Sequence, residues 1–249
     1  AWFTWPVLPM SLWALWRCWR AESWLSSSSA RWMRDSLGLE LHLLTGQAND
    51  TAELLAGLGA HGHMHSGCTE LGDAAAQLAT IDEAYHHYPV LFFFRFEEPY
   101  YAISSIALLA FDAVSLIKSG LDDEEYRWLK ESATLTQLRA AAQRLVNNLF
   151  ESFLHEPPKE PTGIDPAAAE RRRARYYAAL RRLRQAGLKT IADEEEGAAA
   201  YLALRLGWDY LIAELAPHLG YSMVEIDPEG SKPGTSDTRP EFDARLHSE

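Results

Sequence analysis

Three histidines alternate along a short stretch of the chain, and a cysteine follows them closely. They are His61, His63, His65 and Cys68, in the run HGHMHSGCTE. Imidazole and thiolate groups are natural protein ligands of zinc, copper and nickel. Alternate side chains of an extended segment point the same way, so the three imidazoles could converge on one transition-metal ion. The neighbouring glycines favour a surface loop without metal, and the sequence leaves both interpretations open.

Two pairs of an acid and a histidine lie further along the chain. Asp82 stands one helical turn before His86, and Glu83 stands one turn before His87. Each pair would therefore share one face of a helix. Such pairs could bind a metal ion inside a bundle or act as general acid and base. Histidines at the end of a helix also often only satisfy its terminal carbonyl groups, and Pro89 predicts such an end here.

An aspartate stands in the middle of the most apolar stretch, which runs from Tyr100 to Ile117. A helix that is apolar on all sides must be buried in protein or in lipid. Asp112 favours protein surroundings, because an acid that faces lipid is costly. A buried carboxylate needs a partner, and Arg95, Lys118 or a backbone amide could supply one. We therefore expect a structural hydrogen bond at Asp112 rather than catalysis.

Apolar residues at intervals of three and four predict further helices around this central one. The stretches are 31–44, 50–58, 69–88, 123–154, 166–187 and 193–220, and the stretch 123–154 could break near Thr134. The run VLFFFRF could form a strand by propensity, but the sequence offers no second strand to pair with it. The sequence therefore predicts an all-α fold, an irregular bundle of about seven to eight helices around a central buried helix.

Composition limits the class of protein. The chain has 249 residues and a net charge of −12, enough length for one large domain or two small ones. The negative charge argues against a nucleic-acid partner, because neutralising phosphates requires a basic surface. The 2 cysteines cannot form a disulfide framework, which fits a reducing compartment.

Changes in composition divide the chain into five segments. Residues 1–25 hold six of the nine tryptophans and form a docking or membrane-proximal segment. Residues 30–154 form the helical core, and residues 155–166 form a Pro-rich linker. Residues 167–228 form a C-terminal helical pair packed on the core, and the polar residues 229–249 form a disordered tail.

Arginines gather in the helix expected at 166–187. Four of them are Arg171, Arg172, Arg173 and Arg175. They could bind the anionic headgroups of a membrane surface. They could equally pair with acids of the same chain or of another subunit, which is the interpretation that we favour.

Three runs of sequence carry a family resemblance. They are HHYPVLFFFR, YYAISSIALLAFDAVSLIKSGLDDEEYRWLKESA and AAYLALRLGWDYLIAELAPHLGYSMVEIDP. Over residues 78–154 and 195–228 they resemble the soluble region that follows the pore in a family of bacterial potassium-channel-like membrane proteins. The resemblance implies an all-helical region at the cytoplasmic face of the inner membrane. It also implies other copies of the same chain as partners. The chain contains no glycine-tyrosine-glycine filter, so it cannot conduct ions by that mechanism.

The resemblance implies a non-enzymatic function, as a cytoplasmic assembly or regulatory domain that acts through contacts between helix faces. The residues themselves suggest an alternative, a soluble metal-binding protein or metalloenzyme that uses the His-rich loop with Asp82, His86 and His87. A third interpretation places the Trp-rich start and the apolar stretches in lipid, as an integral membrane fragment.

Overall fold

The computed structural model describes residues 50–59, 62–93, 95, 99–154, 158–161, 163 and 165–228. The chain divides into two units, Ala1–His42 and Leu43–Glu249, and every described residue belongs to the second. The Trp-rich segment and the polar tail expected from the sequence lie outside the described residues.

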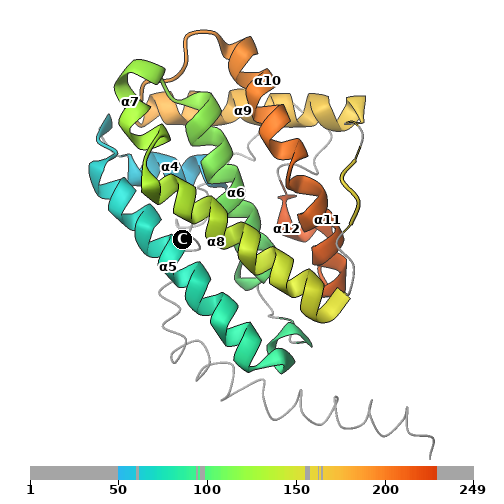
Figure 1. The fold of residues 1–249 in the computed structure, drawn as a ribbon. Coiled ribbons are helices and arrows are strands. Elements are labelled where there is room, and N and C mark those ends of the chain that lie inside the picture. Colours follow the sequence, from blue (N-terminus) through green and yellow to red (C-terminus); the bar gives the residue numbers. More distant parts are fainter. Residues whose placement is uncertain are drawn as a thin grey trace, which may run out of the picture. The chain divides into compact units, whose positions relative to one another are not determined.

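The described residues form nine α-helices and no extended strand, which confirms the predicted all-α class. The helices are α4 (Thr51–Leu58), α5 (His65–His87), α6 (Ile103–Gly120), α7 (Asp123–Lys130), α8 (Ala133–Leu149), α9 (Pro166–Gln185), α10 (Glu194–Leu206), α11 (Asp209–His218) and α12 (Met223–Ile226). Figure 1 shows α5 and α8 side by side, with α6 behind them.

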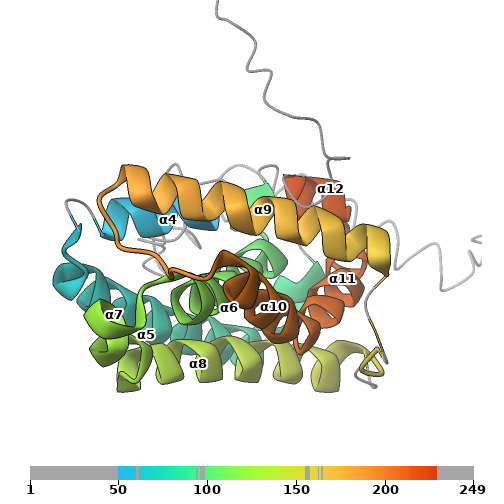
Figure 2. The same ribbon diagram turned by 90° about the horizontal axis from the view of Figure 1, so that it is seen from above.

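Helix α6 is the central element, as the sequence predicted. Every residue in it except Lys118 is buried. Figure 2 shows α4 and α9 on one side of α6, and α5 and α8 on the other. Among the described residues, α6 is the one helix whose length and composition would allow it to cross a membrane, yet 94% of that window is buried inside the protein. Burial by its own neighbours is what the core helix of a bundle requires.

Local capping explains where the helices differ from the expected ranges. The stretch 123–154 breaks close to Thr134, where the sequence allowed it, because the Ser132 hydroxyl accepts a hydrogen bond from the backbone nitrogen of Leu135 at 3.1 Å and begins α8. Gly207 and Trp208 similarly divide the expected helix 193–220 into α10 and α11. The first part of the run that could have been a strand lies in a 3-10 helix, Pro89–Phe93, and the rest of the run is only partly within the described residues.

Candidate functional site

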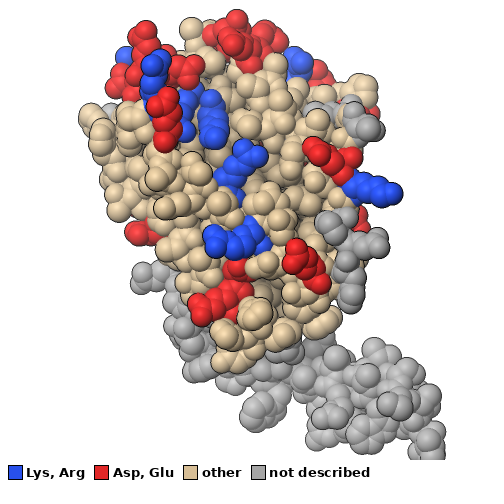
Figure 3. All heavy atoms as spheres, in the orientation of Figure 1, with Lys and Arg blue, Asp and Glu red and all other residues tan. Residues whose placement is uncertain are grey.

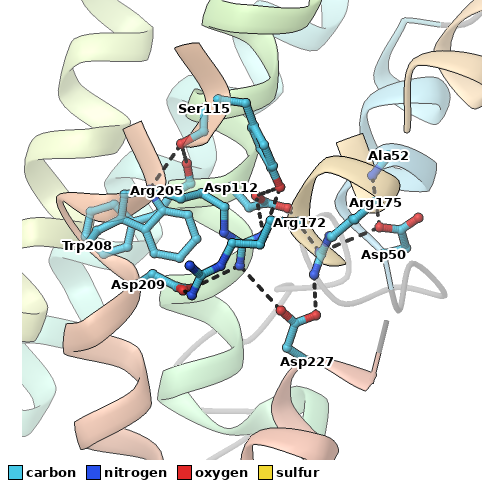
Figure 4. Close-up of polar contacts among 12 residues, drawn as sticks. Asp50, Ala52, Asp112, Ser115, Arg172, Arg175, Arg205, Trp208, Asp209 and Asp227 are labelled. Atoms are coloured by element: carbon cyan, nitrogen blue, oxygen red, sulfur yellow. Dashed lines mark hydrogen bonds and ion pairs between the residues drawn. The ribbon is translucent and has the colours of Figure 1, made fainter. Parts of the chain in front are cut away.

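Four aspartates and three arginines meet inside the fold (Figure 4). We call this set the buried ion network; its members are Asp50, Asp112, Arg172, Arg175, Arg205, Asp209 and Asp227. They come from α6, α9, α10 and α11, from the N-cap of α4 and from the C-cap of α12. The network thus connects helices from both ends of the described chain.

Arg205 is the centre of the network, and its side chain is only 1% exposed. Its Nη1 atom lies 3.3 Å from Asp112 Oδ1. Its Nη2 atom lies 3.1 Å from Asp209 Oδ1 and 3.4 Å from Asp227 Oδ2. The guanidinium also stacks over the Trp208 ring, 4.8 Å from its centroid, a favourable placement for a cation. One side chain of α10 therefore holds carboxylates from three other segments.

Asp112 is fully buried, and both of its carboxylate oxygens are occupied. The Tyr201 hydroxyl donates to Oδ1 at 2.6 Å, and Arg175 donates to Oδ2 at 3.0 Å. Burial alone would raise the pKa of Asp112, but Arg175, Arg205 and Tyr201 together hold that pKa below its usual value. Asp112 is therefore an ionised, shielded carboxylate without access to a substrate proton.

Helix α9 supplies a second guanidinium to each of these carboxylates. Arg175 contacts both Asp112 and Asp227. Arg172 contacts Asp209. Burial lowers the pKa of Arg172, and the neighbouring positive charge of Arg205 lowers it further. The three carboxylates are thus shared between α9 and α10.

Asp50 joins α4 to the network. Its side chain caps α4 by accepting a hydrogen bond from the backbone nitrogen of Ala52 at 3.4 Å. Its Oδ2 atom accepts a hydrogen bond from Arg182 at 2.8 Å, and Arg175 Nη2 lies 3.8 Å from its Oδ1 atom. Burial raises the pKa of Asp50 above its usual value, and the two arginines only partly offset that effect.

These opposite pKa shifts predict opposite dependences of stability on pH. Ionised Asp112 stabilises the fold above the usual aspartate pKa, and that contribution is lost as the pH falls through its lowered folded pKa. Ionised Asp50 costs stability, and that cost appears as the pH rises through its raised folded pKa. We expect Asp112→Asn to lower the free energy of unfolding near neutral pH, with the loss shrinking below about pH 4.

Asp50→Asn is the matched variant, because asparagine also caps helices well. It should leave the free energy of unfolding at neutral pH unchanged or slightly higher. Urea unfolding of both variants and of the wild type, at about pH 7 and about pH 3, measures these differences. Equal losses in the two variants at both pH values would contradict the opposite signs.

The histidine and cysteine candidates do not gather around an ion site in the described part of the chain. There, no group of three His, Cys, Asp or Glu side chains could hold a metal ion. His65 instead stacks on Trp128, with ring centroids 4.4 Å apart, and Cys68 is a free cysteine. His63 precedes α5, whereas His61 lies outside the described residues. Metal binding by this loop therefore stays a prediction.

Of the two acid and histidine pairs near the end of α5, Glu83 and His87 meet as expected, whereas Asp82 bonds to another helix. Asp82 accepts hydrogen bonds from the side-chain nitrogen of Asn148 at 2.8 and 2.9 Å. Glu83 lies 3.6 Å from His87 on the exposed side of the helix. His86 packs edge-on against the His87 ring, with centroids 5.7 Å apart. The hydrogen bonds at Asp82 join α5 to α8, which is a structural use of that acid.

Arg95 does not supply the partner of Asp112. It pairs with Glu225 at 2.7 Å, and its guanidinium lies 5.1 Å from the centroid of the Tyr221 ring. Asp112 faces α9 and α10 and is paired with Arg175 and Arg205 instead. The need for a buried cation was foreseen, but the arginines that meet it were not.

The arginines of α9 mostly pair with acids of the same chain. Besides Arg172 and Arg175, Arg173 lies 3.3 Å from Glu195. Arg171 has no ion pair with any described residue. Contact of this helix with an anionic membrane stays a prediction. Of the four arginines named for that contact, Arg171 is the one without an ion pair to a described residue.

Sequence reasoning missed Arg205, although a signal was there. Arg205 lies one helical turn after Tyr201 and one turn before Trp208, so it shares their apolar face. A charged residue on the buried side of a helix requires a buried counter-charge. Asp112, in the middle of the buried central helix, offers such a counter-charge.

No family model matches the chain, and no curated protein and no solved structure matches it significantly.

Proposed function

We propose that this chain is a non-enzymatic assembly or regulatory module of a membrane protein that resembles bacterial potassium channels, positioned at the cytoplasmic face of the inner membrane. The proposal rests on the resemblance of residues 78–154 and 195–228, and one structural observation supports it. The two stretches are joined by the buried ion network. Asp112 belongs to the first, whereas Arg205, Asp209 and Asp227 belong to the second.

Apolar contacts join the same two stretches. The Trp208 ring stacks on Phe111, with centroids 5.4 Å apart, and its indole nitrogen donates to the Ser115 hydroxyl at 3.1 Å. Segments that share both buried charges and buried rings must fold and act together. That dependence supports the treatment of the two stretches as one module.

The chemistry of the network supports contact rather than catalysis. Asp112 has no exposed surface, and its oxygens are bound by guanidinium and hydroxyl groups. Figure 3 shows that much of the face over α5 and α8 is uncharged but that Lys and Arg side chains lie across its middle, while acids gather at the end formed by α7. Helix α8 places Arg139 and Arg144 at exposed positions. Arginine is enriched at protein interfaces, whereas aspartate and glutamate are depleted, so this face is suited to contact with another copy of the chain.

Native mass spectrometry of the full chain tests the proposal. We expect a homo-oligomer at micromolar concentration. Ala76→Arg, at an exposed position of α5, should raise its dissociation constant about tenfold or more. Ala178→Arg, at an exposed position of α9, is the matched control and should leave the constant unchanged. A monomer at concentrations of about 100 μM would overturn the assembly function.

Elemental analysis of the same samples separates this function from a metalloprotein. One equivalent of zinc, copper or nickel that is lost in His65→Ala or His86→Ala would favour the metalloprotein. An oligomer that still forms when a chelator has removed metal ions from the sample supports the assembly function.

A further inference from the structure

The two halves of α9 are attached to the core by different forces. In the C-terminal half, Tyr176, Ala179, Leu180 and Leu183 are at most 3% exposed. In the N-terminal half, residues 166–175, no apolar residue is buried, although the Arg175 side chain is only 8% exposed. The N-terminal half therefore has no apolar anchor.

Ion pairs hold the N-terminal half instead. Arg172 contacts Asp209 at the start of α11, and Arg175 contacts Asp227 after α12. Arg175 also reaches Asp112 in α6 at 3.0 Å. Figure 2 shows this end of α9 near α11 and α12, whereas the other end lies near α4.

If this half of α9 moves away, the three carboxylates lose their second guanidinium but keep one shared partner. Asp112, Asp209 and Asp227 each also contact Arg205, which belongs to α10. Arginines that leave together with α9 enter water and regain their hydration. Buried ion pairs therefore oppose opening less than buried apolar side chains do, because rehydration offsets much of the lost attraction.

We propose that residues 166–175 form a strap that leaves the core as a unit while the C-terminal half of α9 stays docked. Opening of the strap uncovers Arg205, Asp209 and Asp227 between α10, α11 and α12. The strap is thus a two-state element, and a ligand or partner that binds one state better would shift it. Opening of the strap does not require assembly of the chain, so this inference goes beyond the proposed assembly function.

Hydrogen exchange of the full chain, read by mass spectrometry, tests the strap. The amides of residues 170–175 are the ones to follow, because the first N–H groups of a helix lack intrahelical partners in any case. Raising the salt from about 0.05 M to about 0.5 M should measurably speed their exchange, since salt screens the partly exposed pairs of Arg172 and Arg173 more than the buried pairs of Arg175. Residues 176–185 should exchange at the same rate at both salt concentrations.

Neighbouring arginines provide a matched pair of variants. Arg172→Gln removes an ion pair and should speed exchange of residues 170–175, without an effect on residues 176–185. Arg171→Gln makes the same change of charge and helix propensity, but Arg171 has no ion pair with a described residue, so exchange should stay as in the wild type. Exchange of both halves at one rate, or equal effects of the two variants, would overturn the strap.

Discussion

Replacement of Arg205 with leucine is expected to lower the free energy of unfolding by about 3–5 kcal/mol. The guanidinium is 1% exposed and contacts Asp112, Asp209 and Asp227. Leucine fits an apolar interior but leaves these carboxylates with fewer positive charges in a buried site. An ionised group that is left buried without its partner pays its full desolvation cost. Urea unfolding, followed by circular dichroism, gives the free energies of both proteins.

Arg95→Leu is the control for the removal of an arginine from an ion pair. Arg95 pairs with Glu225, but these side chains are 55% and 37% exposed. An exposed pair of this kind contributes about 1 kcal/mol or less. Similar losses in the two variants would mean that Arg205 is not the centre of a buried network.

The central helix was predictable because its signal is local. Apolar residues fill almost the whole stretch from 100 to 117, and Lys118 and Gly120 mark its end. Burial of such a helix follows from the poor hydration of its surface. The start was misplaced by a few residues, since Pro99–Tyr101 forms a 3-10 turn before α6 begins at Ile103.

The partners of Asp112 were not predictable in the same way. Arg175 and Arg205 lie 63 and 93 residues away along the chain, and no local pattern connects them. Arg95 is much closer in sequence, yet the short 3-10 helix before it places it against Tyr221. Which charge meets which depends on helix packing, and that packing is decided by the whole bundle.

The partners of the arginines of α9 were not predictable from the sequence either. Their spacing allowed both a membrane surface and internal acids as partners. Arg172 and Arg173 meet Asp209 and Glu195 because α9 crosses both α11 and α10. Composition alone could not distinguish these partners, because the acids belong to segments that become neighbours only on folding.

Gly197→Ala is expected to lower the free energy of unfolding by about 3 kcal/mol, the upper end of the usual overpacking range, because the helices pack closely at this position. A Cβ atom at Gly197 would lie 2.0 Å from the Tyr176 hydroxyl and 2.8 Å from the Ser119 carbonyl oxygen. That hydroxyl donates a hydrogen bond to the same carbonyl at 2.8 Å, so it cannot move without breaking the bond. The methyl group therefore has to push α10 away from α6.

Gly57→Ala is the control, because no atom lies within 4 Å of a Cβ at this exposed position of α4. Alanine there should raise the free energy of unfolding by about 0.5–1 kcal/mol through its higher helix propensity. The two substitutions are chemically identical, so their difference in urea unfolding isolates the close approach of α10 to Tyr176. A gain in stability at both positions would show that α10 is not packed as closely on α6 as the contacts of Gly197 require, and α10 also carries Arg205. The position of the central arginine of the network therefore depends on a residue that has no side chain.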